Sequence, residues 1–452
     1  MSMMALSPLD GRYQEKINPL RPIFSEYGLM KFRVHVEIHW IITLSEYANL
    51  PELPSLSQHA QDILKSIAEN FSEEDAARIK HIESGINHDV KAIEYFLKER
   101  IINNAELKNI SEFLHFGCTS EDINNLAYGL MLQTARKQCI LPALDELTTI
   151  LKHLSHDYAE QPMLARTHGQ PATPTTVGKE IANTLYRLQR QIEQLITTPI
   201  MGKLNGASGN YNAFVTAYPN VDWQQLSKNF ICQLGLHWNP YTTQIEPHDT
   251  MSELFSVLMR INTILIDFCR DMWGYIALNY FQQKSINNEV GSSTMPHKIN
   301  PIDFENAEGN FGIANALLDH MSQKLLISRW QRDLSDSTVL RNIGVAIAHS
   351  YLAYQSLCKG LNRTAPNIET IEFDLDHHWE ILAEPIQTLM RCHGIEQPYE
   401  KLKSFTRGQK ITKEKLHEFI ESLSLPHAVK AKLLKLTPRD YIGYAKDLAK
   451  RI

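Results

Sequence analysis

A long apolar seam within residues 251–284 constrains the fold more than any other feature of this sequence. Its large apolar residues recur at alternating spacings of four and three, namely Leu254, Leu258, Ile261, Leu265, Phe268, Met272 and Tyr275. That spacing is typical of a helix packed nearly parallel to its neighbours. A helix over 251–284 would be about 50 Å long. Further apolar residues lie off the seam, namely Val257, Ile264, Ile266, Trp273 and Ile276, so more than one neighbour must bury this helix.

Other stretches repeat the pattern. Apolar residues with similar spacing occupy 140–154, 181–195 and 304–325, and another helical stretch covers 337–361. Together they predict an all-α fold built around a central bundle of long helices. We expect other subunits to cover the outer face of this bundle, because 251–284 is apolar on several sides.

The length of 452 residues exceeds one ordinary hydrophobic core. We expect an N-terminal helical domain (1–110), a central long-helix domain (111–362) and a small C-terminal helical domain (363–452). The N-terminal domain should contain helices at 24–47, 58–70, 72–83 and 90–103. Ser72 and Asp89 are expected to cap two of them.

Composition excludes several classes of protein. Apolar residues make up 43% and charged residues 21%, as in soluble globular proteins. A net charge of −6 gives no reason to expect nucleic-acid binding, so a small anionic substrate would need a local basic site. Six scattered cysteines without a Cys-x-x-Cys pair, no signal core and no apolar run of membrane length predict a cytoplasmic protein without membrane contact.

Residues 291–301 read Gly-Ser-Ser-Thr-Met-Pro-His-Lys-Ile-Asn-Pro and fall between two predicted helices. Glycine and proline break the helical pattern there. The loop gathers groups suited to proton transfer and anion binding, namely Ser292, Ser293, Thr294, His297, Lys298 and Asn300. By composition alone it could be an ordinary serine-rich connection.

The order of these residues resembles the signature loop of the fumarase/aspartase superfamily, Gly-Ser-Ser-x-Met-Pro-x-Lys-x-Asn-Pro. Members of that superfamily cleave a C–N or C–O bond and release fumarate. The residue before the lysine differs between branches, and His297 is typical of one bacterial group of adenylosuccinate lyases. The resemblance therefore implies an adenylosuccinate lyase with a fumarase/aspartase-like fold.

Further motifs along the chain are similar to those of the same family. They are Asp-Gly-Arg-Tyr at 10–13, Asn-His-Asp at 87–89, Thr-Ser-x-Asp-x-Asn at 119–124, Arg-Thr-His within a proline-containing rigid loop at 158–175, and Arg-Asp-x-Ser-Asp-Ser at 332–337. Each also has an ordinary interpretation, as a turn, a helix cap or a charged surface loop.

The resemblance implies specific roles for residues of these motifs. Substrate contacts are expected from Arg12, Tyr13, Asn87, His88, Asp89, Thr119, Ser120, Gln244, Ser293, Lys298, Ile299, Asn300, Asn306, Arg332, Ser337, Thr338 and Arg341. Ser292 would be the catalytic base and His168 the general acid. Histidine suits the second role because its pKa lies near working pH.

The implied reaction is elimination of fumarate from adenylosuccinate, giving AMP, and from SAICAR, giving AICAR, in purine synthesis. It needs no metal or redox cofactor, and His248-Asp249 has no third ligand at a useful spacing. The family also implies a homotetramer in which three subunits build each active site.

Two alternatives remain open. Another fumarate-releasing lyase, such as argininosuccinate lyase, would not need Arg12, Arg332 and Arg341 to bind a phosphate. A catalytically inactive helical scaffold, or a nucleotide-binding regulator without turnover, is the other alternative. Retention of both Ser292 and His168 counts against an inactive relative.

Overall fold

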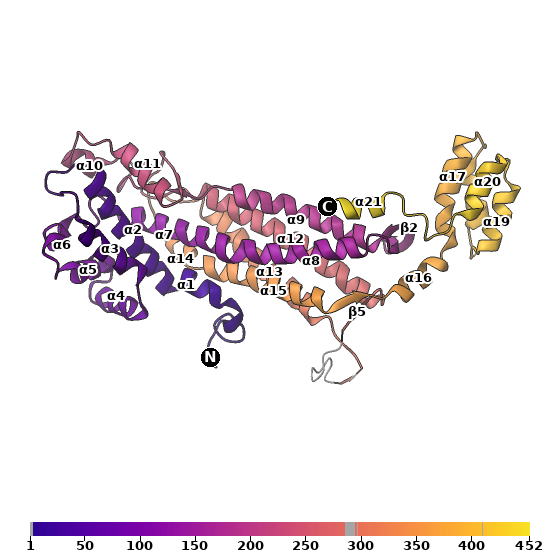
Figure 1. Ribbon diagram of the computed structural model, residues 1–452, viewed down its shortest axis with the longest axis horizontal. Helices are drawn as coiled ribbons and strands as arrows, with labels where there is room; N and C mark the ends of the chain where they lie inside the picture. The colour runs from indigo at the N-terminus through magenta and orange to yellow at the C-terminus, as the bar shows by residue number, and fades with distance from the viewer. Residues whose placement is uncertain (1–2, 285–293, 296, 409) are drawn as a thin grey trace. The chain divides into compact units, whose positions relative to one another are not determined.

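The computed structural model describes residues 3–284, 294–295, 297–408 and 410–452 (Figure 1). Helices dominate these residues, which confirms the all-α prediction. The strands form three short pairs: β1 (Pro162–Thr167) with β2 (Gln170–Thr176), β3 (Met201–Gly202) with β4 (His237–Trp238), and β5 (Phe281–Gln283) with β6 (Thr364–Pro366). The first and third pairs are antiparallel and the second is parallel.

The chain divides into two compact units that interleave along the sequence. The first comprises Met1–Leu144, Gln191–Thr263 and Gly309–Ala353, and the second Asp145–Arg190, Ile264–Glu308 and Tyr354–Ile452. Five long helices contribute residues to both units: α8 (Leu141–Asp157), α9 (Val177–Thr197), α12 (Asp249–Ala277), α13 (Ile302–Lys324) and α15 (Ile343–Asn362). The boundaries 1–110, 111–362 and 363–452 stay a prediction.

The apolar seams are buried, as their spacing predicts. Along α12 the residues Leu254, Leu258, Ile261, Leu265, Phe268 and Met272 are all buried, and every seam residue of 304–325 is buried in or beside α13. The helix expected over 251–284 is too long, because α12 ends at Ala277. Asn279 has a positive φ of 58°, which a right-handed helix does not accommodate. The following residues pair as β5 with β6.

Besides its parts of the five long helices, the first unit contains a second set of helices, most of them from the N-terminal part of the chain. They are η1 (Gln14–Leu20), α1 (Arg21–Phe24), α2 (Glu26–Tyr47), α3 (Gln58–Glu69), α4 (Glu73–Ile86), α5 (Asp89–Ile101), α6 (Ala105–Asn109), η2 (Ser111–Phe113), α7 (Ser120–Ala135), the π-helical turn η3 (Arg136–Ile140), α10 (Asn212–Ala217), α11 (Trp223–Gln233) and α14 (Ser335–Leu340). Helix α2 is central and buried on most sides. Its Trp40 packs on Phe230 of α11, with ring centroids 5.1 Å apart.

The second unit ends in short helices around their own core. They are α16 (Ile368–Asp376), η4 (Trp379–Leu382), α17 (Ala383–Cys392), α18 (Pro398–Thr406), α19 (Lys413–Ser422), α20 (His427–Lys435) and α21 (Ala445–Arg451). Buried apolar residues from η4 to α20, including Leu382, Met390, Leu402, Leu416 and Leu433, form a continuous cluster.

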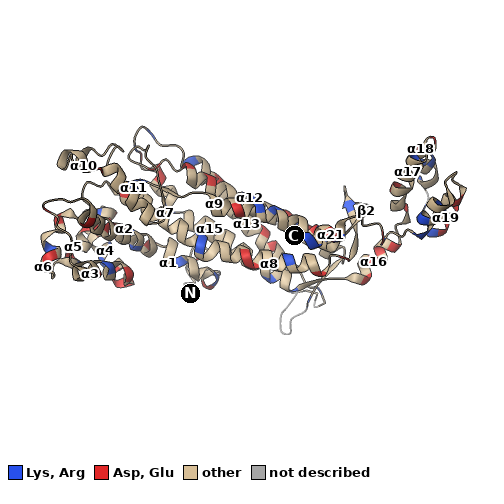
Figure 2. Cartoon of the chain, turned by 45° about the horizontal axis from the view of Figure 1, so that its top comes forward, with Lys and Arg blue, Asp and Glu red and all other residues tan. Residues whose placement is uncertain are grey.

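Charged residues of both signs are interspersed along the helices (Figure 2). Among the residues that the structure describes, no helix is long and apolar enough to cross a membrane. Because charges of both signs are mixed along the helices, a binding site for an anion has to be a local group of cations.

Replacing Ser72 by alanine is expected to lower the free energy of unfolding by about 1 kcal/mol. Ser72 and Asp75 form a capping box at the start of α4, in which each side chain accepts from the other's backbone N–H. The variant loses the serine half of that box. Urea unfolding followed by circular dichroism measures the change against Ser55→Ala, which lies outside any helix. Equal midpoints for the two variants would contradict the assigned cap.

Candidate active site

The predicted Asn-His-Asp motif forms the junction between α4 and α5. Asn87 ends α4 in the left-handed conformation, with φ at 51°. His88 caps α5, because its Nδ1 accepts from the N–H of Lys91 at 3.1 Å. The expectation that Asp89 is the cap is therefore wrong. Since the imidazole performs the capping, the Asp89 carboxylate is available for other partners.

Asp89 lies between two arginines of the first unit. Its Oδ2 accepts from Nη2 of Arg33 at 2.8 Å and from Nη2 of Arg341 at 3.1 Å. Burial alone would raise the pKa of Asp89. The two positive charges and a hydrogen bond from the N–H of Val90 outweigh burial and hold that pKa below its usual value. Asp89 is therefore a carboxylate at neutral pH and fixes the Arg341 guanidinium.

The predicted Thr-Ser motif begins α7. Thr119 is its N-cap and forms a capping box with Asp122, whose Oδ2 accepts from the N–H of Thr119 at 2.8 Å. Asp122 also forms a fully buried ion pair with Lys203, with Nζ and Oδ1 2.8 Å apart. The aspartate of this motif is therefore structural, and it fixes Thr119 and Ser120 at the helix start.

Arg332 is held beside the same helix start by two carboxylates. Its guanidinium contacts Asp336 at 2.7 Å and Glu121 at 3.2 Å. Burial raises the pKa of Glu121, and the positive charge of Arg332 offsets only part of that rise. Gln244 joins the group through its N–H, which donates to the carbonyl of Gln331 at 3.3 Å.

These contacts join into one network of hydrogen bonds and ion pairs within the first unit. Its members are, in order of contact, Arg341, Asp89, Arg33, Asn124, Glu121, Arg332 and Asp336. Three cations and three carboxylates alternate along it. The sequence-predicted residues that the network and its neighbours bring together are Asn87, His88, Asp89, Thr119, Ser120, Gln244, Arg332, Ser337, Thr338 and Arg341.

The N-terminal turn comes close to the same group. A cavity of about 210 Å³ is lined by Asp10 and Arg341 among others, and an adjoining one of about 300 Å³ is lined by Arg341 and Tyr128. Arg12 is exposed, with its guanidinium carbon 5.9 Å from the centroid of the Tyr13 ring. Arg341 and Asp10 of the N-terminal turn thus border the same space.

His168 lies in the second unit, at the tip of a β-hairpin that occupies most of the rigid loop expected for 158–175. Strands β1 and β2 are joined by His168 and Gly169, whose φ angles of 54° and 75° fit a two-residue hairpin turn. Prolines are tolerated because both strands are edge strands. Close to the tip of the hairpin, Arg166 contacts Asp374 and the hydroxyl of Tyr280, which also contacts Asp374.

The signature loop is described only in part. Ser292 and Ser293 lie outside the described residues. Lys298 and Ile299 are exposed, the carbonyl of Ile299 accepts from Nε2 of Gln283 at 2.9 Å, and the Oδ1 of Asn306 accepts from the hydroxyl of Ser356 at 2.7 Å. Asn300 is half-buried before α13. The proposed role of Ser292 thus rests on the sequence motif.

Sequence reasoning assigned no site role to four members of the network, Arg33, Glu121, Asn124 and Asp336. Arg33 lies among buried apolar residues of α2, but Lys31, His35 and Glu37 also interrupt that stretch, so the sequence pattern alone did not distinguish it. Buried charges of that kind are rarely retained without partners. Glu121 occupies an unspecified position of the 119–124 motif, and no sequence signal distinguished it from an acid at a helix start.

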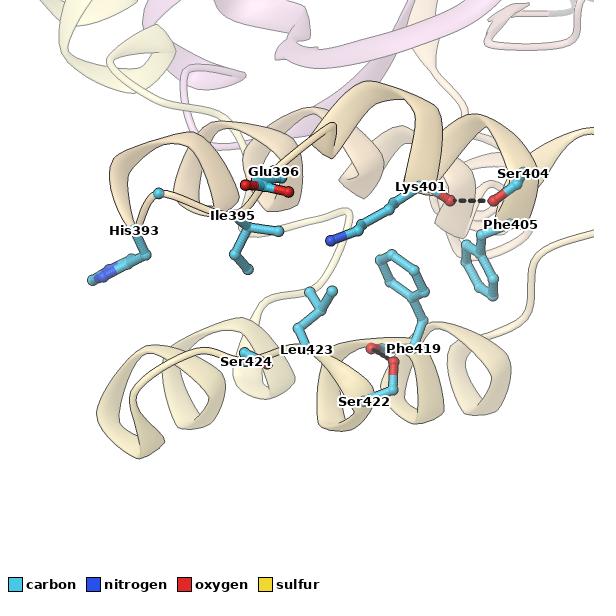
Figure 3. A pocket seen from close by; sticks show the side chains of 11 residues that line it. His393, Ile395, Glu396, Lys401, Ser404, Phe405, Phe419, Ser422, Leu423 and Ser424 are labelled. Atoms are coloured by element: carbon cyan, nitrogen blue, oxygen red, sulfur yellow. Dashed lines mark hydrogen bonds between the residues drawn. The ribbon is translucent and has the colours of Figure 1, made fainter.

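Cavity size does not identify the site. A cleft of about 690 Å³ lies between α18 and α19, where Lys401 and Phe405 face Phe419 and Ser422 (Figure 3). None of the predicted site residues lines it. Among the described residues, no group of three or more His, Cys, Asp or Glu side chains is arranged to hold a metal ion.

Comparisons with known proteins agree with the motifs. A family model described as "Lyase" matches residues 11–314, and one described as "Adenylosuccinate lyase C-terminal" matches residues 328–442. The chain is 57% identical to the adenylosuccinate lyase of Haemophilus influenzae over 451 residues, covering 100% of this chain and 99% of that protein. It is 58% identical to the adenylosuccinate lyase of Escherichia coli K12 over 444 residues, covering 98% and 97%.

The fold is similar to that of a solved fumarate lyase from Mesorhizobium sp. BNC1. The TM-score is 0.77 at 17% sequence identity, over 96% of this chain and 97% of that one. At such low identity the likeness concerns the fold alone, and it confirms the fumarase/aspartase-like architecture expected from the sequence.

Proposed function

The chain belongs to the adenylosuccinate lyase family, and on that premise we propose that it eliminates fumarate from adenylosuccinate to give AMP. The observation that carries this proposal is the identity of 57% and 58% to two adenylosuccinate lyases over nearly the whole chain. The second proposed substrate is SAICAR, which would give AICAR and fumarate. Both substrates carry a succinyl group on nitrogen and a nucleotide phosphate.

The proposed chemistry moves two protons. Ser292 removes a proton from the succinyl carbon next to a carboxylate, the C–N bond breaks, and His168 gives a proton to the leaving nitrogen. The serine hydroxyl is a weak acid, so the alkoxide that accepts this proton needs nearby cations and N–H donors, which Lys298 and Asn300 in the same loop would supply. No redox or metal cofactor takes part in this scheme.

The network of the first unit supports binding of the nucleotide end. The planar guanidinium group of arginine suits phosphate because it can donate two parallel hydrogen bonds to the phosphate oxygens. We assign the phosphate to Arg12, Arg332 and Arg341, with Tyr13, Ser337 and Thr338 beside them. Asn87, His88, Thr119, Ser120 and Gln244 would contact the rest of the substrate. Arginines 332 and 341 are already oriented by carboxylates, which lowers the entropy cost of binding.

The proposed assembly is a cytoplasmic homotetramer in which three subunits contribute to each site. Exposed apolar residues on the long helices support an interface there, since Trp273 of α12 and Ile313 of α13 are each 50% exposed. No nucleic acid or membrane partner is proposed.

The test is turnover of purified full-length protein, followed by ultraviolet absorbance with adenylosuccinate, SAICAR and argininosuccinate in parallel. We expect AMP, AICAR and fumarate from the first two substrates and no turnover of argininosuccinate. Turnover of argininosuccinate alone would replace the proposal with the neighbouring lyase. A well-folded protein that converts none of the three would be an inactive relative.

A further inference from the structure

Arg33 is a buried cation in the middle of α2. It is 3% exposed, and its helical neighbours Met30, Val34 and Val36 are buried apolar residues. Removing a guanidinium from water is costly unless its donors are satisfied. The contacts that satisfy Arg33 should therefore indicate why a charge is placed here.

The two arms of Arg33 reach two different helix starts. Its Nη2 donates to Oδ2 of Asp89, the first residue of α5, at 2.8 Å. Its Nε donates to Oδ1 of Asn124, in the second turn of α7, at 2.9 Å. One planar side chain thus fixes the first turn of α5 relative to α7. Those helix starts carry His88 and Ser120, both assigned to the substrate above.

Asp89 also pairs with a second arginine, Arg341, and the two arginines differ in how exposed they are. The side chain of Arg33 is 4% exposed, whereas that of Arg341 is 46% exposed and lines two cavities. Arg341 can therefore exchange Asp89 for a phosphate oxygen. Arg33 remains buried and continues to neutralise Asp89 when Arg341 turns to the ligand.

Stability alone does not explain this arrangement. Buried ion pairs can often be replaced by apolar residues with no loss of stability, because desolvation offsets the attraction. Arg33 instead bridges an aspartate and an asparagine on two helices, and both lie within four residues of predicted substrate contacts.

We propose that Arg33 is a positioning residue for the nucleotide site, acting through Asp89 and Asn124. The inference rests on the proposed function, and it adds a residue that touches no substrate. Arg33 fixes the spacing of the α5 and α7 starts and keeps Asp89 ionised as the anchor of Arg341.

The experiment compares Arg33→Met, Arg33→Lys and Arg136→Met with wild type. Arg136 is a matched control: a half-buried arginine of the same unit that donates to the backbone carbonyls of Leu195 and Thr198. For each full-length protein, kcat and KM for adenylosuccinate are measured from pH 5 to pH 9, together with the urea unfolding midpoint.

Arg33→Met is expected to raise KM about tenfold to a hundredfold. That change corresponds to the binding free energy typically lost with a hydrogen bond to a charged group. The acid limb of the kcat/KM profile should move to higher pH, because a cation beside the Asp89 carboxyl is lost and its pKa rises. The groups beside Asp89 that remain are Arg341 and Tyr128 of α7.

Arg33→Lys separates geometry from charge. An ammonium keeps a cation near Asp89 but has no fork to reach Asn124 as well. KM is expected to rise about tenfold while the acid limb stays at its wild-type position. This variant also decides the question if Arg33→Met does not fold.

A purely structural Arg33 would behave like Arg136→Met, with a lower urea midpoint and unchanged KM and pH profile in both variants. That result would overturn the inference and leave the proposed function intact. Wild type without turnover of adenylosuccinate would instead remove the proposed function, and this inference with it.

Discussion

Replacing His168 is expected to lower kcat for adenylosuccinate by about two to four orders of magnitude, the usual contribution of a general acid. The leaving nitrogen must gain a proton as the C–N bond breaks, and no other group is assigned to supply it. KM should change little, because the ground-state contacts assigned to the nucleotide belong to other residues.

The choice of substitution follows from the backbone of the hairpin. His168 has a φ of 54°, a conformation that asparagine tolerates better than alanine. His168→Asn therefore preserves the turn and removes the titrating group, whereas His168→Ala also strains the turn. We expect both variants to lose activity to the same extent if proton donation is the role of His168.

Stopped-flow or steady-state absorbance measures kcat, with His153→Asn as the control for an exposed histidine on α8. Ser292→Ala should cause a loss of at least comparable size, because it removes the base. A decrease below tenfold in His168→Asn, with the protein folded, would assign the general acid to another residue.

The long helices could be predicted from sequence because the spacing of their apolar residues follows the buried side of each helix. The seam residues of α12 and α13 recur on one stripe, and nearly all of them are buried. The end of α12 could not be placed in the same way. Phe281–Gln283 leave the helix to pair with Thr364–Pro366, and no local pattern reveals a partner so distant along the chain.

The sequence motifs indicate candidate site residues, but not the contacts that hold those residues in place. Motifs located His88, Asp89 and Arg332, yet the cap of α5 was assigned to Asp89, whereas His88 forms it. Which one caps depends on Arg33 and Arg341, which bind Asp89 from other parts of the chain. Long-range ion pairs of this kind leave no periodic signal in the sequence.

Replacing Lys203 by methionine is expected to lower the free energy of unfolding by about 3–5 kcal/mol, because it leaves a buried charge without its counterion. Lys203 and Asp122 are both 0% exposed, and Nζ also donates to the carbonyl of Gly206 at 3.0 Å. The N–H groups of Asn205 and Gly206 donate to Asp122 as well. Methionine fills nearly the same space, so the loss reports charge and hydrogen bonding more than a cavity.

Urea unfolding at fixed protein concentration measures this loss against Lys80→Met, whose lysine is half-exposed and pairs with Glu26 and Glu83 at the surface. Such surface pairs contribute at most about 1 kcal/mol. Adding Asp122→Asn to Lys203→Met removes the buried charge and should recover part of the loss. Recovery would be incomplete, because the asparagine Nδ2 is a donor and would face a backbone N–H that now donates to Asp122. Equal midpoints for Lys203→Met and Lys80→Met would mean that the ion pair does not hold the start of α7.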